Sequence, residues 1–471
     1  MAGRLTMVPV TAAASDIIVV GGGIAGLVIA WEAARAGRRV IVCESGDDSG
    51  GMLRRGRVAG VDVDLGAESF AIRTSGVADL VADAALPLQI VEPRPEGAHL
   101  VLPGAFGRVR RMPLPRRAVV GMPAEPEAGD VVRVIGRAGA RRAAQERDLP
   151  AGIGRESGVE PSLFDLATAR YGRRVAERLV DPLCQSVYSQ PSSAVRLSAV
   201  HPSLWAEFER RGSLTAAAGA VAPAARAGSA VRGIDGGMWR LAAALRDAAE
   251  AAGAIIRTGA AVQALRPAAD GVEVMLAGET LRAGHVVVAT GPAAAGALLH
   301  VDAAAPVGGA VRLVTAEVVS RALDAHPVGS GVIVAPAAGG PAKALTHVDA
   351  KWDWAARALP AHTHVVRLSA RDADAPGVDT PAAVAGELRL LTGARIRPAD
   401  VWALTETRWT DAVTSASAAA AAWRTAARAA TPAGIHLAGA TVAGTGLASV
   451  IPHARELARE LVARTSHPPT A

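Results

Sequence analysis

The feature that most constrains the fold is a glycine-rich turn near the start of the chain. Gly21, Gly23 and Gly26 satisfy the pattern G-x-G-x-x-G, between a β-branched run over residues 16–20 and a helix predicted over 25–36. Glycines at this spacing permit a tight turn, let the backbone approach a pyrophosphate and allow the helix to pack closely on the strand. The sequence therefore predicts a β-α-β unit that binds a dinucleotide at the N-terminus of the helix.

A carboxylate at the end of the next predicted strand fits the same unit. Glu44 closes an apolar run over residues 39–44. It follows the glycines by about 20 residues, where an acid accepts hydrogen bonds from the ribose of an adenine dinucleotide. The alternative is a solvated acid at a strand end. The glycines, the β-α-β context and the acid together favour the adenine dinucleotide.

The remaining pattern predicts an α/β protein in which the dinucleotide module is discontinuous. Apolar runs predict strands that resume the first sheet over 254–258, 271–276 and 285–290, and a second sheet with strands over 311–320, 331–335 and 364–369. Seven prolines between residues 93 and 126, followed by arginine-rich segments, indicate a largely helical insertion. We expect a Rossmann-like cofactor domain from 1–75, 231–300 and 405–471, a helical substrate- or membrane-facing insertion over 76–230, and a mixed-sheet substrate domain over 301–404.

Charge and composition narrow the partners. Half of the 471 residues are hydrophobic and 20% are charged, which excludes a disordered chain. The net charge is +6, and the only lysines are Lys343 and Lys351. Arginine binds phosphates and carboxylates in a fork geometry, so the excess favours an anionic small ligand. No basic run interleaved with aromatic residues predicts a nucleic-acid partner.

Other sequence signals bear on location and on metals. Cys43 and Cys184 are too few for a disulfide framework, so we expect a reducing compartment and a cytoplasmic protein. Residues 1–15 lack a signal-peptide pattern. The uncharged stretch over 431–454 is interrupted by glycines and Pro452, so we expect no membrane span, and peripheral membrane contact stays open. The histidines show no HExxH or paired spacing, so no metal site is predicted.

Motifs beyond the glycine turn point to a known family. Gly50-Gly51-Met52-Leu53-Arg54 and Gly66-Ala67-Glu68-Ser69-Phe70 follow Glu44, and Arg170-Tyr171-Gly172, Asp181-Pro182-Leu183, Gly236-Gly237-Met238, Arg408-Trp409 and Gly444-Thr445-Gly446-Leu447 come later. In this order, from about Asp16 to Ala463, they resemble the protoporphyrinogen/coproporphyrinogen oxidase family of flavin amine oxidase-like proteins. The resemblance implies an FAD-binding domain of the glutathione reductase/amine oxidase type.

The resemblance also implies site residues. Cofactor contacts would come from Gly21, Gly22, Gly23, Ile24, Ala25, Gly26, Glu44, Ser45, Gly50, Gly51, Arg54, Gly66, Ala67, Glu68, Ser69, Val262, Trp409, Gly439, Ala440, Thr445, Gly446 and Leu447. Arg73 and Arg111 are candidate clamps for substrate propionates, and Tyr188 is a candidate lining residue. The alternatives are exposed arginines and a core tyrosine. No side chain is predicted to be catalytic, because the flavin performs the redox step.

The function implied is an FAD-dependent, O2-using oxidase that converts coproporphyrinogen III to coproporphyrin III in haem biosynthesis. Six electrons would be removed and hydrogen peroxide released. No obvious membrane anchor precedes or interrupts the motifs, which favours this tetra-propionate substrate over protoporphyrinogen IX. A flavin amine oxidase and a tetrapyrrole-binding flavoprotein without turnover are the alternatives. The oligomeric state stays open.

Overall fold

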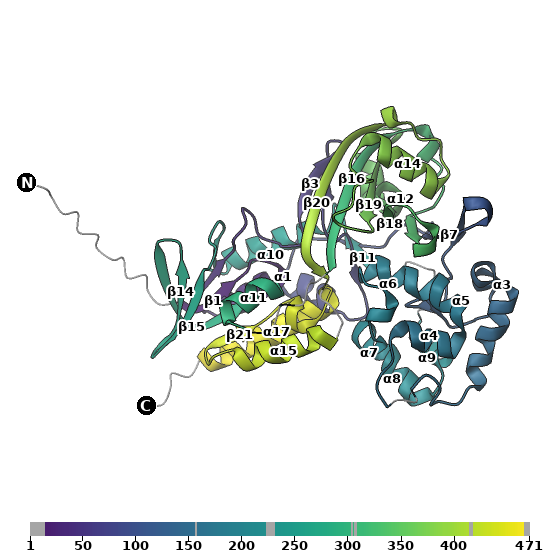
Figure 1. Ribbon diagram of the computed structural model, residues 1–471. Coiled ribbons are helices and arrows are strands. Elements are labelled where there is room, and N and C mark those ends of the chain that lie inside the picture. The colour runs from purple at the N-terminus through teal and green to yellow at the C-terminus, as the bar shows by residue number, and fades with distance from the viewer. Residues whose placement is uncertain are drawn as a thin grey trace, which may run out of the picture.

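The molecule is a mixed α/β protein with three visible parts. The computed structural model describes residues 15–155, 158–222, 231–302, 305, 309–413 and 418–465. Figure 1 shows one part built around β1, β15 and β21, a second sheet that contains β16 and β20, and a helical part that contains α3 to α9. Most of residues 1–15, which lack a signal-peptide pattern, lies outside the described residues.

The first part is a seven-stranded sheet covered by helices on both faces. Its strands are β1 (Ser15–Val20), β2 (Val40–Cys43), β12 (Ile255–Arg257), β13 (Ala264–Ala268), β14 (Gly271–Leu276), β15 (Glu279–Val288) and β21 (Ile435–Leu437), in the order β12-β2-β1-β15-β14-β13 with β21 on β15. The helices are α1 (Ile24–Arg35), α2 (Gly76–Asp83), α10 (Trp239–Ala251) and α17 (Leu447–Thr465) on one face, and α11 (Pro292–Leu299) and α15 (Ala418–Ala430) on the other. Pairing of β1 with β2 and β15 is parallel, as expected for strands buried on both faces. The predicted resumption of this sheet after residue 231 is confirmed.

The second sheet has seven strands, and it takes in segments that the sequence pattern assigned elsewhere. Its strands are β7 (His99–Pro103), β8 (Val109–Pro113), β16 (Gly309–Val319), β17 (Gly331–Val334), β18 (Ala342–His347), β19 (Thr363–Ala370) and β20 (Val401–Val413), in the order β20-β16-β19-β18-β17-β7-β8. Helix α14 (Pro381–Thr392) packs against it, and α12 (Val348–Lys351) and α13 (Asp353–Ala358) follow β18.

Two predicted boundaries therefore differ from the strand pairing. Strands β7 and β8 lie in the stretch predicted as a helical insertion, yet β7 pairs with β17. Each of the two strands ends on a proline, which breaks an apolar run but is tolerated at a strand end. Strand β20 crosses the boundary predicted at residues 404 and 405 and pairs with β16 along its length. Exposed charged residues such as Glu406 and Arg408 interrupt its apolar pattern, so the sequence did not predict this strand.

The helical part has its own core. Helices α3 (Gly129–Ala144), α4 (Leu163–Tyr171), α6 (Asp181–Val187), α8 (Pro202–Arg211) and α9 (Leu214–Val221) surround it, with the short α5 (Arg173–Val175) and α7 (Leu197–Val200) between them. Inside it, Arg170 donates from Nε to the Oε1 atom of Glu146 at 2.8 Å, and both side chains are fully buried. Removing either partner would leave the other charge buried and uncompensated, which would destabilise this core.

Short strands link these parts. The hairpin β3 (Arg55–Val58) and β4 (Val61–Asp64) is a separate two-stranded sheet that does not join the first sheet. Strand β11 (Val231–Ile234) lies between β5 (Phe70–Ala71) and β6 (Ile90–Val91), and β9 (Ala118–Val119) pairs with β10 (Met122–Pro123). Among the described residues, no helix has the length and apolar character needed to cross a bilayer.

Candidate cofactor and substrate site

The glycine turn between β1 and α1 has the shape that the sequence predicts. Gly21 has a φ of +104°, which favours glycine, and its N–H donates to the carbonyl of Cys43 at 2.8 Å. A Cβ added to Gly26 would overlap the carbonyl oxygen of Gly21. A Cβ added to Gly23, the residue before α1, would meet nothing within 4 Å. The turn is thus packed closely on the strand side and open at the helix N-terminus, where anions bind.

Glu44 is held beside the turn by backbone donors. Its Oε2 atom accepts from the N–H of Gly22 and its Oε1 atom from the N–H of Gly46, both at 2.7 Å. The Oγ of Ser45 donates to the same Oε1 at 3.3 Å. A carboxylate has about four acceptor positions, so Glu44 retains capacity for a further donor. This fits an acid that orients the glycine turn and contacts a ribose hydroxyl.

The Gly50-Gly51 pair packs directly on the glycine turn. The N–H of Gly50 donates to the carbonyl of Gly22 at 2.8 Å, and a Cβ on Gly51 would lie 3.3 Å from the Cα of Gly23. Both glycines have a positive φ. Asp48, just before them, forms an ion pair with Arg246 at 3.2 Å. The Gly21–Gly26 turn and the Gly50-Gly51 pair therefore form one continuous side of the candidate cofactor site.

The segment from Asp64 to Phe70 is fixed by contacts from distant strands. A Cβ on Gly66 would overlap the carbonyl oxygen of Met52, and the N–H of Ala67 donates to that oxygen at 3.0 Å. From β20, the indole Nε1 of Trp409 donates to the carbonyl of Leu65 at 3.0 Å. Trp409, which was predicted to contact the cofactor, thus lies against this motif, and it reaches it from β20 of the second sheet.

Glu68 has partners that sequence reasoning missed. Its carboxylate pairs with Lys351, and with Arg367 of β19 at 2.9 Å. These cations lower its pKa although burial acts in the opposite direction. The Glu68 carboxylate is therefore occupied by these two ion pairs. Only its backbone would then make the cofactor contact that is predicted for this residue. No local signal marks the partners, which lie about 280 and 300 residues further along the chain.

Asp64 was also missed. Its carboxylate accepts from the N–H groups of Met238 and Trp239, at 2.9 and 2.8 Å, and so caps α10. Burial raises its pKa to about 7. It lines a small recess with Glu68, Thr315 and Trp354. The Gly236-Gly237-Met238 motif marks the helix start, but nothing in the sequence pairs it with Asp64.

The C-terminal motif completes the site. Gly439, Gly444 and Gly446 have φ values of +82°, +86° and +96°, and added Cβ atoms on Gly444 and Gly446 would meet nothing within 4 Å. The short helix α16 (Ala440–Ala443) and the long α17 begin after the first and last of these glycines. Ile24, Ala67, Ala440 and Leu447 pack against one hydrophobic core. Segments more than 400 residues apart thus converge around two helix N-termini.

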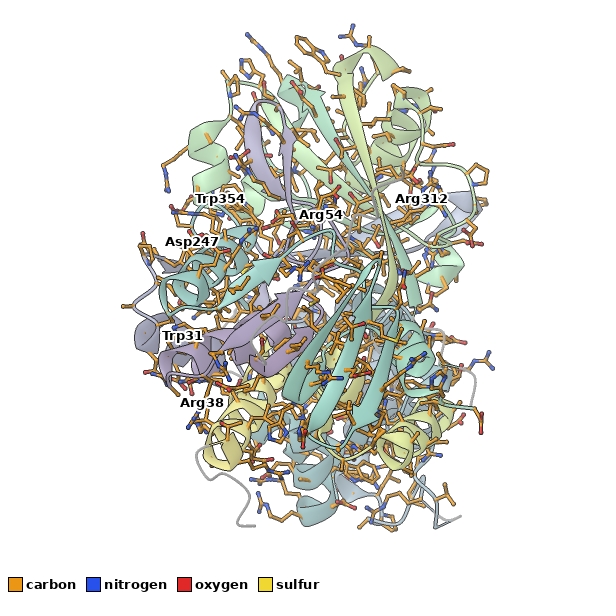
Figure 2. All side chains as sticks on the ribbon, turned by 90° about the vertical axis from the view of Figure 1, so that its left-hand side faces the viewer. Trp31, Arg38, Arg54, Asp247, Arg312 and Trp354 are labelled. Carbon is orange, nitrogen blue, oxygen red and sulfur yellow. The ribbon has the colours of Figure 1, made fainter. Side chains whose placement is uncertain are left out.

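Two more predicted contacts lie at the edges of this site. The loop before Val262 returns to Glu44, since the N–H of Ala260 donates to the carbonyl of Glu44 at 2.7 Å. Arg54 is exposed, and the described residues give its guanidinium no hydrogen bond or ion pair. Figure 2 shows Arg54 where the first part of the molecule meets the second sheet. Both residues remain available to a ligand.

The three substrate candidates have different surroundings. Arg73 is exposed, donates to the Oγ of Ser449 at 2.7 Å, and lies close enough to Tyr188 and His201 for its charge to lower the pKa of each. Burial is the larger effect on Tyr188 and raises its pKa to about 12. Arg111 is instead engaged at the end of α14, where it donates to the carbonyls of Leu390 and Leu391 at 2.6 and 3.0 Å. The structure thus groups Arg73 with Tyr188 and gives Arg111 a helix-capping role.

The comparisons with known proteins decide the family. Residues 24–463 match the model of the flavin containing amine oxidoreductases. The chain belongs to this family. It is thereby a flavin-dependent oxidoreductase. Gly23, Gly444 and Gly446, whose surroundings are open, would accommodate the flavin cofactor.

Similar proteins include porphyrinogen oxidases and amine oxidases. Coproporphyrinogen III oxidase of Mycobacterium tuberculosis (strain ATCC 25618 / H37Rv) is 33% identical over 223 residues, 46% of this chain and 47% of that protein. Protoporphyrinogen oxidase 1, chloroplastic, of Arabidopsis thaliana is 27% identical over 208 residues, 43% of this chain and 36% of the plant protein. The matched region thus spans about half the length, or less, of these curated relatives.

Solved structures support the fold. A crystal structure from Exiguobacterium sp. 255-15, named "Putative protoporphyrinogen oxidase", has a TM-score of 0.77 at 21% identity, covering 96% of this chain and 99% of that one. Putrescine oxidase bound to putrescine has a TM-score of 0.66 at 16% identity, covering 96% and 100%. The predicted fold of the amine oxidase type is confirmed.

Proposed function

We propose that this protein is an FAD-dependent, O2-using oxidase that converts coproporphyrinogen III to coproporphyrin III. The observation that carries the proposal is that Gly23 and Gly446, each open to a ligand, immediately precede α1 and α17, which pack in one core, and that Glu44 is held against the first of these turns. Two N–H-bearing helix ends suit the pyrophosphate and the electron-accepting ring of one FAD. The coproporphyrinogen III oxidases among the relatives supply the substrate class.

The chain's own residues would orient both ligands. Gly23 admits the pyrophosphate, Glu44 accepts from the ribose, and Gly444 to Leu447 present N–H groups where negative charge develops on reduction. Bound FAD supplies the two-electron chemistry. Three two-electron oxidations convert one porphyrinogen and three O2 to one porphyrin and three hydrogen peroxide, which balances atoms and electrons. Arg73 is the proposed anchor for a propionate, because a fork-shaped cation binds a carboxylate well.

The cytoplasm, with peripheral membrane contact left open, is the proposed location. Cys43 and Cys184 are both free and buried in the structure, in keeping with a reducing compartment.

Anaerobic spectroscopy tests the activity. Purified protein should be yellow, and its flavin absorbance should bleach on addition of coproporphyrinogen III and recover with air. Porphyrin fluorescence and peroxide should then appear in a ratio of about one to three, as the six-electron balance requires. Bleaching by protoporphyrinogen IX alone would favour that substrate. Porphyrin binding without bleaching by either would overturn the oxidase.

An amine oxidase is the second candidate, because the fold is shared with putrescine oxidase and cyclohexylamine oxidase. Only two tyrosines occur in the chain. Tyr171 is fully buried in the helical part, where its hydroxyl donates to the carbonyl of Pro123 at 3.2 Å. That leaves Tyr188 as the tyrosine available to line an amine site. Peroxide formation with putrescine or cyclohexylamine would support this candidate over the porphyrinogen oxidase.

A further inference from the structure

A cluster of histidines and aspartates lies in the second sheet, and none of its residues is assigned to the cofactor or substrate. His326 follows a short helical turn, His347 ends β18, Asp349 lies on α12 and His364 on β19. One ligand atom each of His326, His347 and Asp349 lies within 4.8 Å of the others. His347, Asp349 and His364 are buried, whereas His326 is half-exposed and gives access from solvent.

The atoms of this cluster already have the spacing of metal ligands. His347 Nε2 lies 3.2 Å from both Asp349 Oδ2 and His364 Nδ1, and His364 Nδ1 lies 2.8 Å from Asp349 Oδ2. Bonds of about 2.0–2.1 Å in a tetrahedral zinc site separate the ligand atoms by about 3.4 Å. At 2.8–3.2 Å the two ring nitrogens and the carboxylate oxygen are within hydrogen-bond distance of one another, so a zinc ion would replace the protons that they share and move them slightly apart.

Surrounding contacts orient the ligands. His364 Nε2 lies 3.1 Å from Asp324 Oδ1, and Asp324 Oδ2 lies 2.8 Å from His362 Nδ1. With its proton on Nε2, His364 donates to Asp324 and turns a bare Nδ1 toward the cluster, which is the carboxylate–histidine–metal arrangement. The other oxygen of Asp349 accepts from the N–H of Val365 at 2.9 Å. The carboxylate is thus anchored at Oδ1, while Oδ2 faces the two ring nitrogens.

Charge and ligand type select the ion. Asp324 and Asp349 bring two negative charges, which one divalent cation balances. Imidazole nitrogens with one carboxylate oxygen suit zinc, whereas calcium and magnesium prefer all-oxygen sites. We propose that His326, His347, Asp349 and His364 bind one Zn²⁺ that ties the turn at residue 326, β18, α12 and β19 together. This proposal does not depend on the proposed function.

Metal analysis of the full chain tests the proposal. Protein stripped with EDTA, reloaded with ZnCl2 and desalted should hold one zinc per chain. Reloading with CoCl2 should give the d–d absorption of four-coordinate cobalt, read as a difference spectrum against the flavin bands. The melting temperature should rise with zinc, because an ion that binds only the folded state stabilises it.

Matched variants locate the ion. H347N and D349N should lower zinc affinity by more than about 100-fold, and D324N, which alters only the support, by about 10–100-fold. H436N is the control, since His436 and His285 also place two ring nitrogens 3.2 Å apart, and within the described part of the chain no carboxylate pairs with them. It should keep full zinc content. Flavin absorbance and circular dichroism report whether each variant folds. If H347N or D349N does not fold, the zinc affinity of D324N tests the proposal instead. Less than about 0.2 zinc per wild-type chain, or unchanged zinc in H347N, D349N and D324N, would overturn the proposal.

Discussion

The guanidinium of Arg367 lies 2.9 Å from the carboxylate of Glu68, and it also donates to the carbonyl of Gly66 at 2.7 Å. Arg367 belongs to β19 of the second sheet, whereas Gly66 and Glu68 belong to the flavin-side motif. Lys351 pairs with the same carboxylate. One largely buried anion with two cations therefore joins the two parts of the molecule.

Replacing Glu68 by Gln should be costly. The change would leave Lys351 and Arg367, whose side chains are 16% and 11% exposed, without their counter-charge. Breaking one partner of a fully buried pair costs about 3–5 kcal/mol, so the expected loss lies toward the lower end of that range. Urea unfolding should show a loss of this size. The control is Glu207→Gln, whose pairs with Arg210 and Arg211 are more exposed and should contribute less than about 1 kcal/mol. Equal losses in the two variants would contradict the prediction.

Two neighbouring glycines should respond differently to the same methyl group. Gly23→Ala meets no protein atom and has a normal φ of −69°, so the melting temperature of the flavin-free protein should hardly change. Its flavin content should fall at least tenfold, because the methyl group occupies the space of the pyrophosphate. Gly26→Ala overlaps the carbonyl of Gly21 and should destabilise the flavin-free protein itself. A Gly23→Ala protein with full flavin content would show that the pyrophosphate lies elsewhere.

Arg73→Met and Arg111→Met should separate substrate binding from stability. Loss of a charged hydrogen bond is worth about 1.5–3 kcal/mol, so Arg73→Met should raise KM for coproporphyrinogen III by about 10–100-fold, with flavin content unchanged. Arg111→Met removes the cap of α14 and should lower the melting temperature while KM stays constant. Steady-state porphyrin fluorescence and thermal melts measure both. A KM effect in Arg111→Met alone would reverse the assignment.

Lys343 should make stability rise with alkaline pH. Burial lowers its pKa to about 8, and Nζ donates to the Oγ of Ser189 at 2.8 Å. The unfolded chain, with a lysine pKa of about 10.4, binds more protons between pH 8 and 10.4, so this group's contribution to folding grows over that window. Lys343→Met should be more stable than wild type at pH 7, and the difference should shrink toward pH 10. A constant difference in urea midpoints across this range would contradict the prediction.

His436 should act in the opposite pH range. Burial, then the charges of His285 and Arg464, lower its pKa to about 4. The unfolded chain binds more protons between about pH 4 and 6.5, so stability falls as the pH drops through that window. His436→Asn should flatten the decline in melting temperature between pH 6.5 and 4.5. If wild type and variant decline in parallel, His436 does not carry the effect.

Local patterns predicted the parts of the site that local geometry determines. Gly21, Gly23, Gly26 and Glu44 lie within one β-α-β unit, so their spacing along the chain fixes their spacing in space. The partners of Glu68 could not be found this way, since Lys351 and Arg367 reach it only through the second sheet. The same holds for the histidine cluster. Its ligands are spread from residue 326 to 364 and meet only when β18 and β19 pair, so a search for local ligand spacing missed them.

Strand assignment failed where the local pattern and the tertiary environment disagree. The sequence of β20 alternates charged and small residues in a manner that suits an exposed segment, yet β20 pairs with β16 over most of its length. Arg111 illustrates the same difficulty for a single side chain. Its position in a proline-rich, arginine-rich stretch suggested a ligand contact, and only the fold brings the end of α14 to its guanidinium.

The packing of α17 against α1 has a consequence for biosynthesis. The glycine turn emerges from the ribosome before residues 447–465, which supply one wall of its core, and before β21, which pairs with β15. Contacts this distant in sequence form slowly. The nascent chain therefore exposes an incomplete nucleotide pocket until α17 has been made, so chaperone protection of α1 and late capture of the cofactor are both expected.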